Sequence, residues 1–329
     1  MTGLALQFVV LAIIIIAAGT LLALSADRIG EQTDLGGTLA GFLLLAAATS
    51  LPELVVDCNA ASIGAADLAV GDLLGSSIFN LLILGVIDLL HRRPVRILSS
   101  VSAAHALSAI TSIVLTGIVV ISILIHPRSE FLQIGVGPWL VVAAYLLSVR
   151  LIYFDQKVAS DSTKQHPAGT TPLRKNVLYF AVAAAVVLFS GPWLARVADR
   201  LATESGLGGT FVGTIFVALT TSLPEIITTF TAVRIGSFEL AAGNIFGSNC
   251  FNIAILPAVD FCYGSGPILQ DVETTHGVTA GAIIVITGLA TMGLLYRVEK
   301  RYWLVEPDAL LVVVLSILAL VGVMVLNGS

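Results

Sequence analysis

Two copies of one short motif place a glutamate deep inside a long apolar segment. The motif TSLPE occupies residues 49–53 and recurs at residues 221–225. A carboxylate at membrane depth costs at least about 2.5–3.5 kcal/mol on insertion scales, so an acidic residue there marks a functional site. Glu53 and Glu225 are therefore the first candidates for chemistry.

The proline that precedes each glutamate also predicts a break in the helix. Proline removes a backbone donor and clashes with the carbonyl four residues earlier, so each helix should kink or end there. Carbonyl groups freed at membrane depth are tolerated where they face protein or a polar cavity. Thr49 lies four residues before Glu53, and this spacing places both side chains on one helical face.

A stripe of polar side chains follows each motif on the next apolar segment. The spacing i, i+4, i+8 puts each stripe on one helical face. The stripes consist of Asp72, Ser76 and Asn80 in the first half and of Asn244, Ser248 and Asn252 in the second. The glycines that accompany them would let neighbouring backbones approach closely.

The two glutamates have no lysine or arginine nearby in the sequence. Their charge must be balanced by a proton, by a distant side chain or by a bound cation, and we favour the cation. Two carboxylates, two asparagine amides, several hydroxyls and freed carbonyls offer only oxygen ligands, and the four segments contain no histidine. This set suits a hard cation such as Ca²⁺, or Na⁺ of similar size, whereas zinc and copper prefer histidine or cysteine.

The elements that position these residues are apolar helices. The chain has 329 residues, of which 57% are hydrophobic and 11% charged, and its mean hydropathy is +0.99. A water-soluble domain carries about 25% charged residues, so the chain is expected to be an all-α polytopic membrane protein. The formal net charge of −5 excludes a nucleic-acid binder that works through bulk basic charge. The three cysteines form neither a disulfide framework nor a metal motif.

Ten apolar runs predict ten transmembrane helices, and a polar segment at 155–176 predicts a flexible linker. The runs lie at 6–25, 36–64, 67–90, 99–125, 132–154, 177–196, 208–236, 240–262, 276–296 and 308–326. The first run is expected to stay in the protein, because its start, MTGLALQF, lacks the positive charge of a signal peptide. Loops after odd-numbered runs hold 13 of the 16 Lys and Arg residues, which predicts that these loops and the linker are cytoplasmic and both termini extracytoplasmic.

An internal repeat relates the two halves of the chain. Residues 35–53 align on residues 207–225 without a gap, at an offset of 172 residues, and 11 of the 19 positions are identical. The same offset carries residues 71–80 onto 243–252 with five of ten identical. Because each half holds five spans, the second half should enter the membrane from the opposite face, as in the inverted repeats of many transporters. The expected domains are 1–154 and 177–329, joined by the linker.

These motifs resemble those of the calcium/cation antiporter superfamily, in its sodium/calcium exchanger branch of prokaryotic type. The TSLPE elements and the elements GDLLGSSIFN and GNIFGSNCFN correspond to that family's two alpha-repeats, here at 36–90 and 208–262. The resemblance extends over both halves. It implies a membrane transporter, not an enzyme, that exchanges Ca²⁺ for Na⁺ by alternating access between the two sides of a membrane.

The resemblance also implies a role for each matching residue. Glu53 and Glu225 would be the carboxylates shared by Ca²⁺ and Na⁺, with Thr49 and Thr221 completing the Ca²⁺ ligands. Further ion-binding groups would come from Ser50, Ser222, Ser76, Ser248, Asn80, Asn252 and the carbonyl of Ala218. Ca²⁺ and Na⁺ are then transported ions, and neither a cofactor nor an obligatory protein partner is evident.

Three positions depart from the family pattern. Potassium-dependent relatives carry an aspartate where this chain has Asn252, which argues against potassium co-transport. Some prokaryotic relatives also carry an acid there, so the site in this chain has one titratable group fewer than theirs. Asp72 stands where the family usually has asparagine, and Asp57 stands where the second repeat has Thr229. The roles of Asp57 and Asp72 stay open between attraction of cations and helix capping.

Two other functions fit part of the pattern. A Ca²⁺/H⁺ exchanger is the nearest alternative, because a buried glutamate can carry a proton, although such exchangers typically show a GNxxE-like element instead of TSLPE. A cation channel is a weaker alternative, since inverted repeats and broken helices favour a transporter. A compact exchanger without a regulatory domain is expected in the plasma membrane of a prokaryote.

Overall fold

The computed structural model describes residues 2–33, 35–90, 104–161, 171–206, 211–296 and 307–327, and nearly all of these are helical. Several predictions fall partly outside them. These concern the basic loops at 91–103 and 297–306, the centre of the linker at 162–170, and the starts of the fourth and seventh runs.

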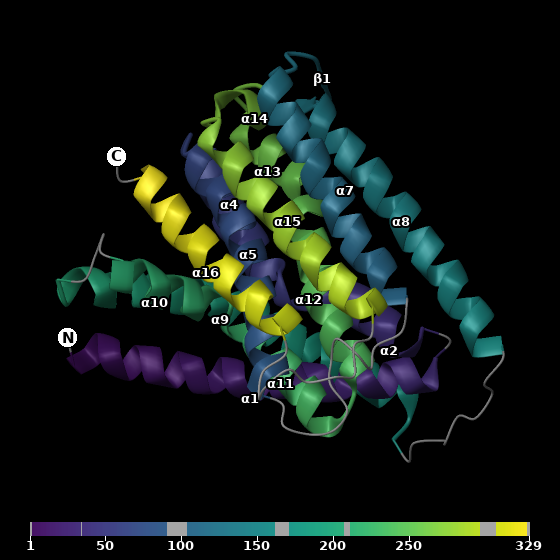
Figure 1. Cartoon of the computed structure of the whole chain (residues 1–329). Helices are drawn as coiled ribbons and strands as arrows, with labels where there is room; N and C mark the ends of the chain where they lie inside the picture. The colour runs from purple at the N-terminus through teal and green to yellow at the C-terminus, as the bar shows by residue number, and fades with distance from the viewer. Residues whose placement is uncertain are drawn as a thin grey trace.

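One helix, or a series of consecutive helices, occupies each of the ten predicted ranges (Figure 1). The first half contains α1 (Thr2–Gln32), α2 (Gly36–Leu39), the π-helix η1 (Ala40–Leu45), α3 (Ala46–Thr49), α4 (Leu51–Ser62), α5 (Ala66–Leu90), α7 (Ala104–Ile125) and α8 (Val136–Asp161). The second half contains α9 (Leu173–Glu204), α10 (Phe211–Thr221), α11 (Leu223–Ile235), α12 (Phe238–Ala254), α13 (Leu256–Tyr263), α14 (Ile268–Asp271), α15 (Thr275–Tyr296) and α16 (Pro307–Asn327).

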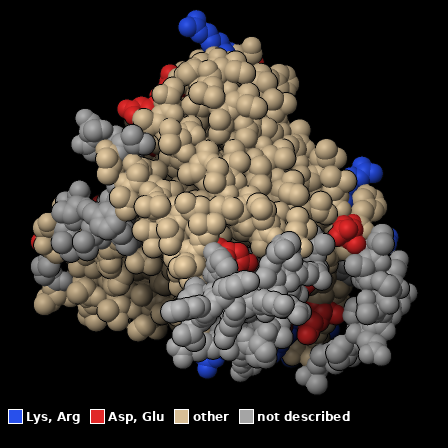
Figure 2. All heavy atoms as spheres, in the orientation of Figure 1, with Lys and Arg blue, Asp and Glu red and all other residues tan. Residues whose placement is uncertain are grey.

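The length and apolar character of these helices suit a membrane. Among the described residues, seven helices are long and apolar enough to cross a bilayer, or eight if the bent pair Gly36–Thr49 and Leu51–Ser62 counts as one span. The face shown in Figure 2 is mostly uncharged, with Lys and Arg toward its edges and a few patches of Asp and Glu, some of them well inside the outline. Many large apolar side chains point outward, as expected where lipid replaces water around the protein.

The fifth predicted span begins later than expected. Helix α8 starts at Val136, not at residue 132, because β1 (Glu130–Phe131) and β2 (Ile134–Gly135) form a two-stranded hairpin. The Asp260 carboxylate accepts a hydrogen bond of 2.7 Å from the backbone N–H of Gly135 and so holds the hairpin in place. At its other end α8 continues through residues 155–161 of the expected linker.

Both TSLPE segments break their helix, as predicted. Helices α3 and α4 meet at Ser50, whose φ and ψ are −91° and 3°, and the two parts of the span are bent by 43°. Helices α10 and α11 meet in the same way at Ser222, with φ −82° and ψ 10°. Each proline then lies in the first turn of the new helix, where its missing donor costs little. Thr49 and Glu53 therefore lie on two helices, and the prediction of one shared helical face is wrong.

The two halves of the chain pack closely against each other. Helix α1 packs along α9, and α12 packs against η1 (Figure 1). The contact between α12 and η1 depends on glycine, because a Cβ atom on Gly41 would lie 3.0 Å from the Cα of Gly243 and closer still to the Leu240 carbonyl. The backbones of the two halves thus touch beside the polar stripe of α12.

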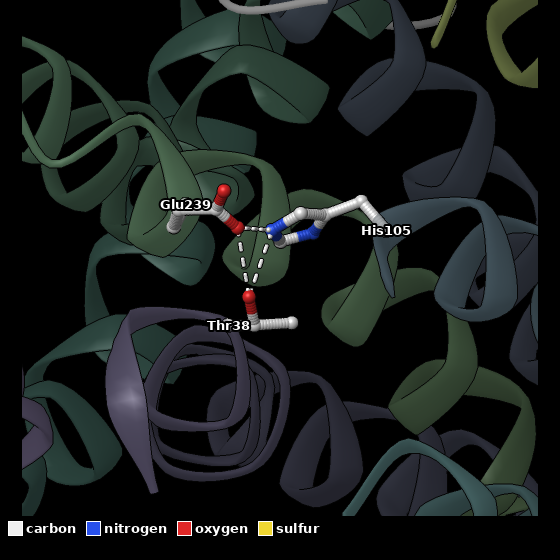
Figure 3. A network of polar contacts seen from close by, with 3 residues as sticks. All are labelled: Thr38, His105 and Glu239. Carbon is white, nitrogen blue, oxygen red and sulfur yellow. Dashed lines mark hydrogen bonds and ion pairs between the residues drawn. The ribbon is translucent and has the colours of Figure 1, made fainter. Parts of the chain in front are cut away.

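A buried histidine joins the halves at one end of this contact (Figure 3). The Glu239 carboxylate on α12 lies 2.6 Å from Nε2 of His105 on α7 and accepts a hydrogen bond of 2.8 Å from the hydroxyl of Thr38 on α2. The Thr38 hydroxyl is also 3.2 Å from the same histidine nitrogen. Three helices from different parts of the chain are therefore tied at one point.

Candidate ion-binding site

The helix breaks bring Glu53 and Glu225 to the centre of the molecule. Each glutamate lies in the first turn after its break, where the positive end of a helix dipole stabilises an anion. Their exposed fractions are 3% and 2%, and the two carboxylates interact electrostatically with each other. In the described part of the chain, Oε2 of each glutamate has no hydrogen-bond partner. Two buried carboxylates thus lie within electrostatic range of each other, and each has an oxygen without a hydrogen-bond partner among the described residues.

Hydroxyl groups from both halves surround these carboxylates. Glu225 lies within interacting range of Thr49 and Ser50, which belong to the other half. The Thr49 hydroxyl is 3.4 Å from the hydroxyl of Ser248 on α12. The Ser50 hydroxyl is buried, and among the described residues no group lies at hydrogen-bonding geometry to its oxygen. Four of the predicted site residues, together with Glu53, therefore converge.

A second group of predicted residues lines a cavity of about 530 Å³. These are Ser76 on α5 and Ala218, Thr221 and Ser222 at the end of α10. Thr221 donates a hydrogen bond of 3.0 Å to the Ala218 carbonyl. Thr221 also borders a smaller gap, of about 10 Å³, together with Glu53. The large cavity thus reaches the neighbourhood of the glutamates.

The predicted asparagines are buried and only partly satisfied. Asn80 donates a hydrogen bond of 3.1 Å to the Asn249 side chain, whereas Oδ1 of Asn80 and Oδ1 of Asn252 are without a partner in the described residues. Asn249, which the sequence analysis did not single out, donates in turn to the Ser77 carbonyl at 3.2 Å. The repeat could have indicated it, because the 172-residue offset relates Ser77 to Asn249.

Two further carboxylates lie beside Glu53. Asp57 and Asp72 both interact electrostatically with it, and Asp72 lines the large cavity and the small gap. Even so, the described residues contain no group of three or more His, Cys, Asp or Glu side chains arranged around one metal position. A cation between Glu53 and Glu225 would therefore depend on hydroxyl, amide, carbonyl or water oxygens for its remaining ligands.

Equivalent interfaces of the two halves differ in how closely they pack. On α12, a Cβ atom added to Gly247 would lie 2.6 Å from the Phe42 carbonyl of η1. Its counterpart on α5 is Gly75. A Cβ atom added there would meet no other atom within 4 Å, because Gly75 borders the large cavity. One interface is closed by backbone contact, and the other is open.

The polar ends of these interfaces differ in the same way. Glu239 and its counterpart Asp67, 172 residues earlier, each lie beside a histidine. At the closed interface the pair Glu239 and His105 also holds Thr38. At the open one, Asp67 is half exposed, lies 3.1 Å from His276 and lines the cavity. The glutamates are thus approached by a cavity from one side and covered by packed helices on the other.

Comparison with known proteins assigns this arrangement to a family. A family profile described as "Sodium/calcium exchanger protein" matches residues 3–154 and 175–327. The chain is 27% identical over 270 residues to CaxA of Alkalimonas amylolytica, a protein named as an antiporter, covering 78% of this chain and 82% of CaxA. It is 32% identical over 228 residues to the inner membrane protein YrbG of Escherichia coli (strain K12), covering 67% and 68% of the two chains.

The fold has been seen in a solved structure. The sodium-calcium exchanger NCX_Mj, soaked with Na⁺ and Sr²⁺, superposes with a TM-score of 0.72 over 98% of this chain and 99% of its own, at 19% sequence identity. The likeness therefore extends over the helices that carry the glutamates and the polar stripes. Since the family profile matches both halves, the protein belongs to the sodium/calcium exchanger family and is an integral membrane transporter, not an enzyme.

Proposed function

We propose that the protein exchanges Ca²⁺ for Na⁺ across a membrane by alternating access. The observation that carries this proposal is a pair of buried glutamates, each just after a helix break, that interact electrostatically and each have a carboxylate oxygen without a partner among the described residues. Two such carboxylates, surrounded by neutral oxygens, suit a hard cation of double charge. Family membership supports cation antiport as the type of transport.

The proposed ion ligands are the residues that the motifs indicate. Glu53 and Glu225 supply the charge, and Thr49 and Thr221 join them around Ca²⁺. Na⁺ and Ca²⁺ together use a wider set, which adds Ser50, Ser222, Ser76, Ser248, Asn80, Asn252 and the carbonyl of Ala218. The close approach of Thr49, Ser50 and Ser248 supports this assignment, as does the position of Ser76, Ala218, Thr221 and Ser222 on one cavity.

The charge of the site explains why such a protein exchanges ions and does not leak them. When both glutamates are ionised and no ion is bound, two negative charges lie in a medium of low dielectric constant, which opposes their movement through the closed interior. One Ca²⁺ or two Na⁺ neutralise them. The loaded site therefore changes sides readily, and the empty one does not.

The architecture that we propose is ten transmembrane helices in two inverted five-helix repeats, at 1–154 and 177–329. The central linker is cytoplasmic, both termini are extracytoplasmic, and the location is the plasma membrane of a prokaryote. The closed contact of α12 with η1 and the open cavity between α5 and α10 lie at positions related by the repeat. Exchange of these two packing arrangements, by rocking one pair of spans against the rest, would expose the glutamates to each side in turn.

Uptake of ⁴⁵Ca²⁺ into proteoliposomes tests the function. Vesicles loaded with Na⁺ are diluted into Na⁺-free medium, beside vesicles loaded with K⁺ and vesicles that carry only a pH gradient. We expect uptake only into the Na⁺-loaded vesicles, because only these supply the counter-ion. Uptake driven by the pH gradient would replace the proposal with Ca²⁺/H⁺ exchange, the nearest alternative. Uptake that ignores all internal ions would replace it with a channel.

A further inference from the structure

The repeat places two equivalent pairs of side chains next to the glutamates. The 172-residue offset relates Asp57 to Thr229 and Asp72 to Asn244. In the second half, the Asn244 side-chain amide donates hydrogen bonds of 2.9 Å to Thr229 and 3.0 Å to Thr228. The pair in the second half is thus a neutral contact between α11 and α12 with a satisfied donor.

In the first half the same two positions are both carboxylates. Asp57 on α4 and Asp72 on α5 lie close enough to interact electrostatically, on two helices that pack against each other. Asp57 has an exposed fraction of 0%, and within the described ranges neither of its oxygens receives a hydrogen bond. Two ionised carboxylates close together repel each other, and each buried oxygen without a donor is costly. The pair therefore needs something positive between or beside its oxygens.

One member of the pair, Asp72, is reachable from the large cavity, unlike its counterpart in the second half. Asp72 lines the cavity of about 530 Å³ and also the small gap that it shares with Glu53. Asn244, at the equivalent place, is fully buried. The positions at which the halves differ in charge are therefore the ones that an ion would pass on its way from the cavity to Glu53.

We propose that Asp57 and Asp72 together bind a partly hydrated Ca²⁺ ion between the cavity and Glu53, as a separate site that loads the central one. Two carboxylates balance the double charge, and water in the cavity supplies ligands that the protein does not. The inference rests on the proposed function, because it concerns the route to the same pair of glutamates. With only two protein carboxylates as ligands, binding is expected to be weak, at about 10⁻⁴–10⁻³ M, which is the weak end of the range of protein calcium sites.

Removal of the central site allows the new one to be measured alone. In the purified double variant Glu53→Gln/Glu225→Gln, binding of Mn²⁺ is followed by electron paramagnetic resonance, since Mn²⁺ prefers the same oxygen ligands. We expect one weak site, from which Ca²⁺ displaces Mn²⁺ at a lower concentration than Na⁺ does at constant ionic strength. Adding Asp57→Thr and Asp72→Asn, which copy Thr229 and Asn244 of the second half, should remove this weak Mn²⁺ site.

Matched variants separate this site from general attraction and from misfolding. Asp67→Asn neutralises another carboxylate on the same cavity and should leave the Mn²⁺ site in place. Asp57→Asn alone keeps one charge and offers a donor to Asp72, so it should weaken binding without abolishing it. In the otherwise unchanged protein, Asp57→Thr/Asp72→Asn should raise the KM for Ca²⁺ uptake about tenfold with little change in kcat, since a charged cleft concentrates its ion by at least that factor.

Several results would overturn the inference. These are the absence of bound Mn²⁺ after removal of the glutamates, binding that survives Asp57→Thr/Asp72→Asn, or equal loss in Asp67→Asn. If Asp57→Thr/Asp72→Asn changed only the pH dependence of ⁴⁵Ca²⁺ uptake and left Mn²⁺ binding unchanged, the two carboxylates would share a proton and not a cation. Failure of Na⁺-driven uptake would overturn the proposed function, yet the Mn²⁺ measurement would still report on Asp57 and Asp72.

Discussion

At the scale of single residues, the position of each glutamate depends on the serine and proline before it. Ser50 and Ser222 leave the helical conformation, and the proline follows in the first turn of the next helix. Glu53 and Glu225 therefore emerge at a helix start, where the dipole favours their charge, instead of in the middle of a continuous helix. The insertion penalty of a carboxylate is partly offset in this way, without a lysine or arginine as partner.

Replacing either glutamate should abolish exchange. Glu53→Gln and Glu225→Gln each keep the size of the side chain but leave one negative charge to hold a doubly charged ion. We expect Na⁺-driven ⁴⁵Ca²⁺ uptake to fall to background in each variant, with elution as a folded protein in size-exclusion chromatography. Glu31→Gln, at an exposed position on α1, is the control and should transport normally. Full uptake by Glu53→Gln would remove Glu53 from the site.

At the scale of elements, the same glycine pattern on α5 and α12 produces two different interfaces. Gly243 and Gly247 of α12 lie against the backbone of η1, whereas Gly71 and Gly75 of α5 border the cavity. Glycine allows the first contact because no Cβ stands between the helices. A sequence pattern that permits close packing therefore does not determine whether the helices are packed.

Alanine at these equivalent glycines should have unequal effects. Gly247→Ala places a Cβ 2.6 Å from the Phe42 carbonyl, so the helices must separate, at a cost of about 1–3 kcal/mol for overpacking. Gly75→Ala meets nothing within 4 Å and should leave the stability of this state unchanged. Thermal unfolding of the two variants in detergent measures the difference. Equal melting temperatures would contradict the closed packing of α12 on η1.

At the scale of the whole molecule, the asymmetry between the halves describes one state of a transporter. Three features mark the closed side: the backbone contact of α12 with η1, the approach of Thr49 to Ser248, and the tie of Thr38, His105 and Glu239 (Figure 3). Of the positions related to these by the 172-residue offset, Asp67, Gly75, Ser76 and Thr221 line the cavity. If the protein alternates as we propose, the cavity must close while the tie opens.

A cross-link across the cavity should stop this alternation. In a variant without the three native cysteines, Gly75→Cys on α5 and Ala218→Cys on α10 place thiols on two helices that line the cavity. A disulfide requires the two Cα atoms to come within about 7 Å, as they would when the cavity closes. We expect oxidation to inhibit ⁴⁵Ca²⁺ uptake and reduction to restore it, whereas uptake by each single variant should not respond to oxidation. Full uptake by a completely cross-linked sample would show that the cavity need not open.

The helices and their breaks could be read from the sequence because their causes are local. Apolar runs, the proline of TSLPE and the 172-residue repeat predict helices at the positions where the structure has them. The early start expected for the fifth run was wrong because the hairpin at 130–135 depends on Asp260, which lies far away in the chain. Hydropathy alone carries no information about such a contact.

The sequence by itself determined the membrane class, the acidic residues at membrane depth and the equivalence of the two motifs, since these follow from residue type and spacing. Only the tertiary structure decided that Thr49 meets Ser248, that Asn80 meets Asn249, and that Asp57 and Asp72 interact electrostatically. It also decided which of two equivalent interfaces is open. The reason is physical: equivalent sequences allow both packings, and the free energy of the whole assembly, not any local preference, selects which helices touch.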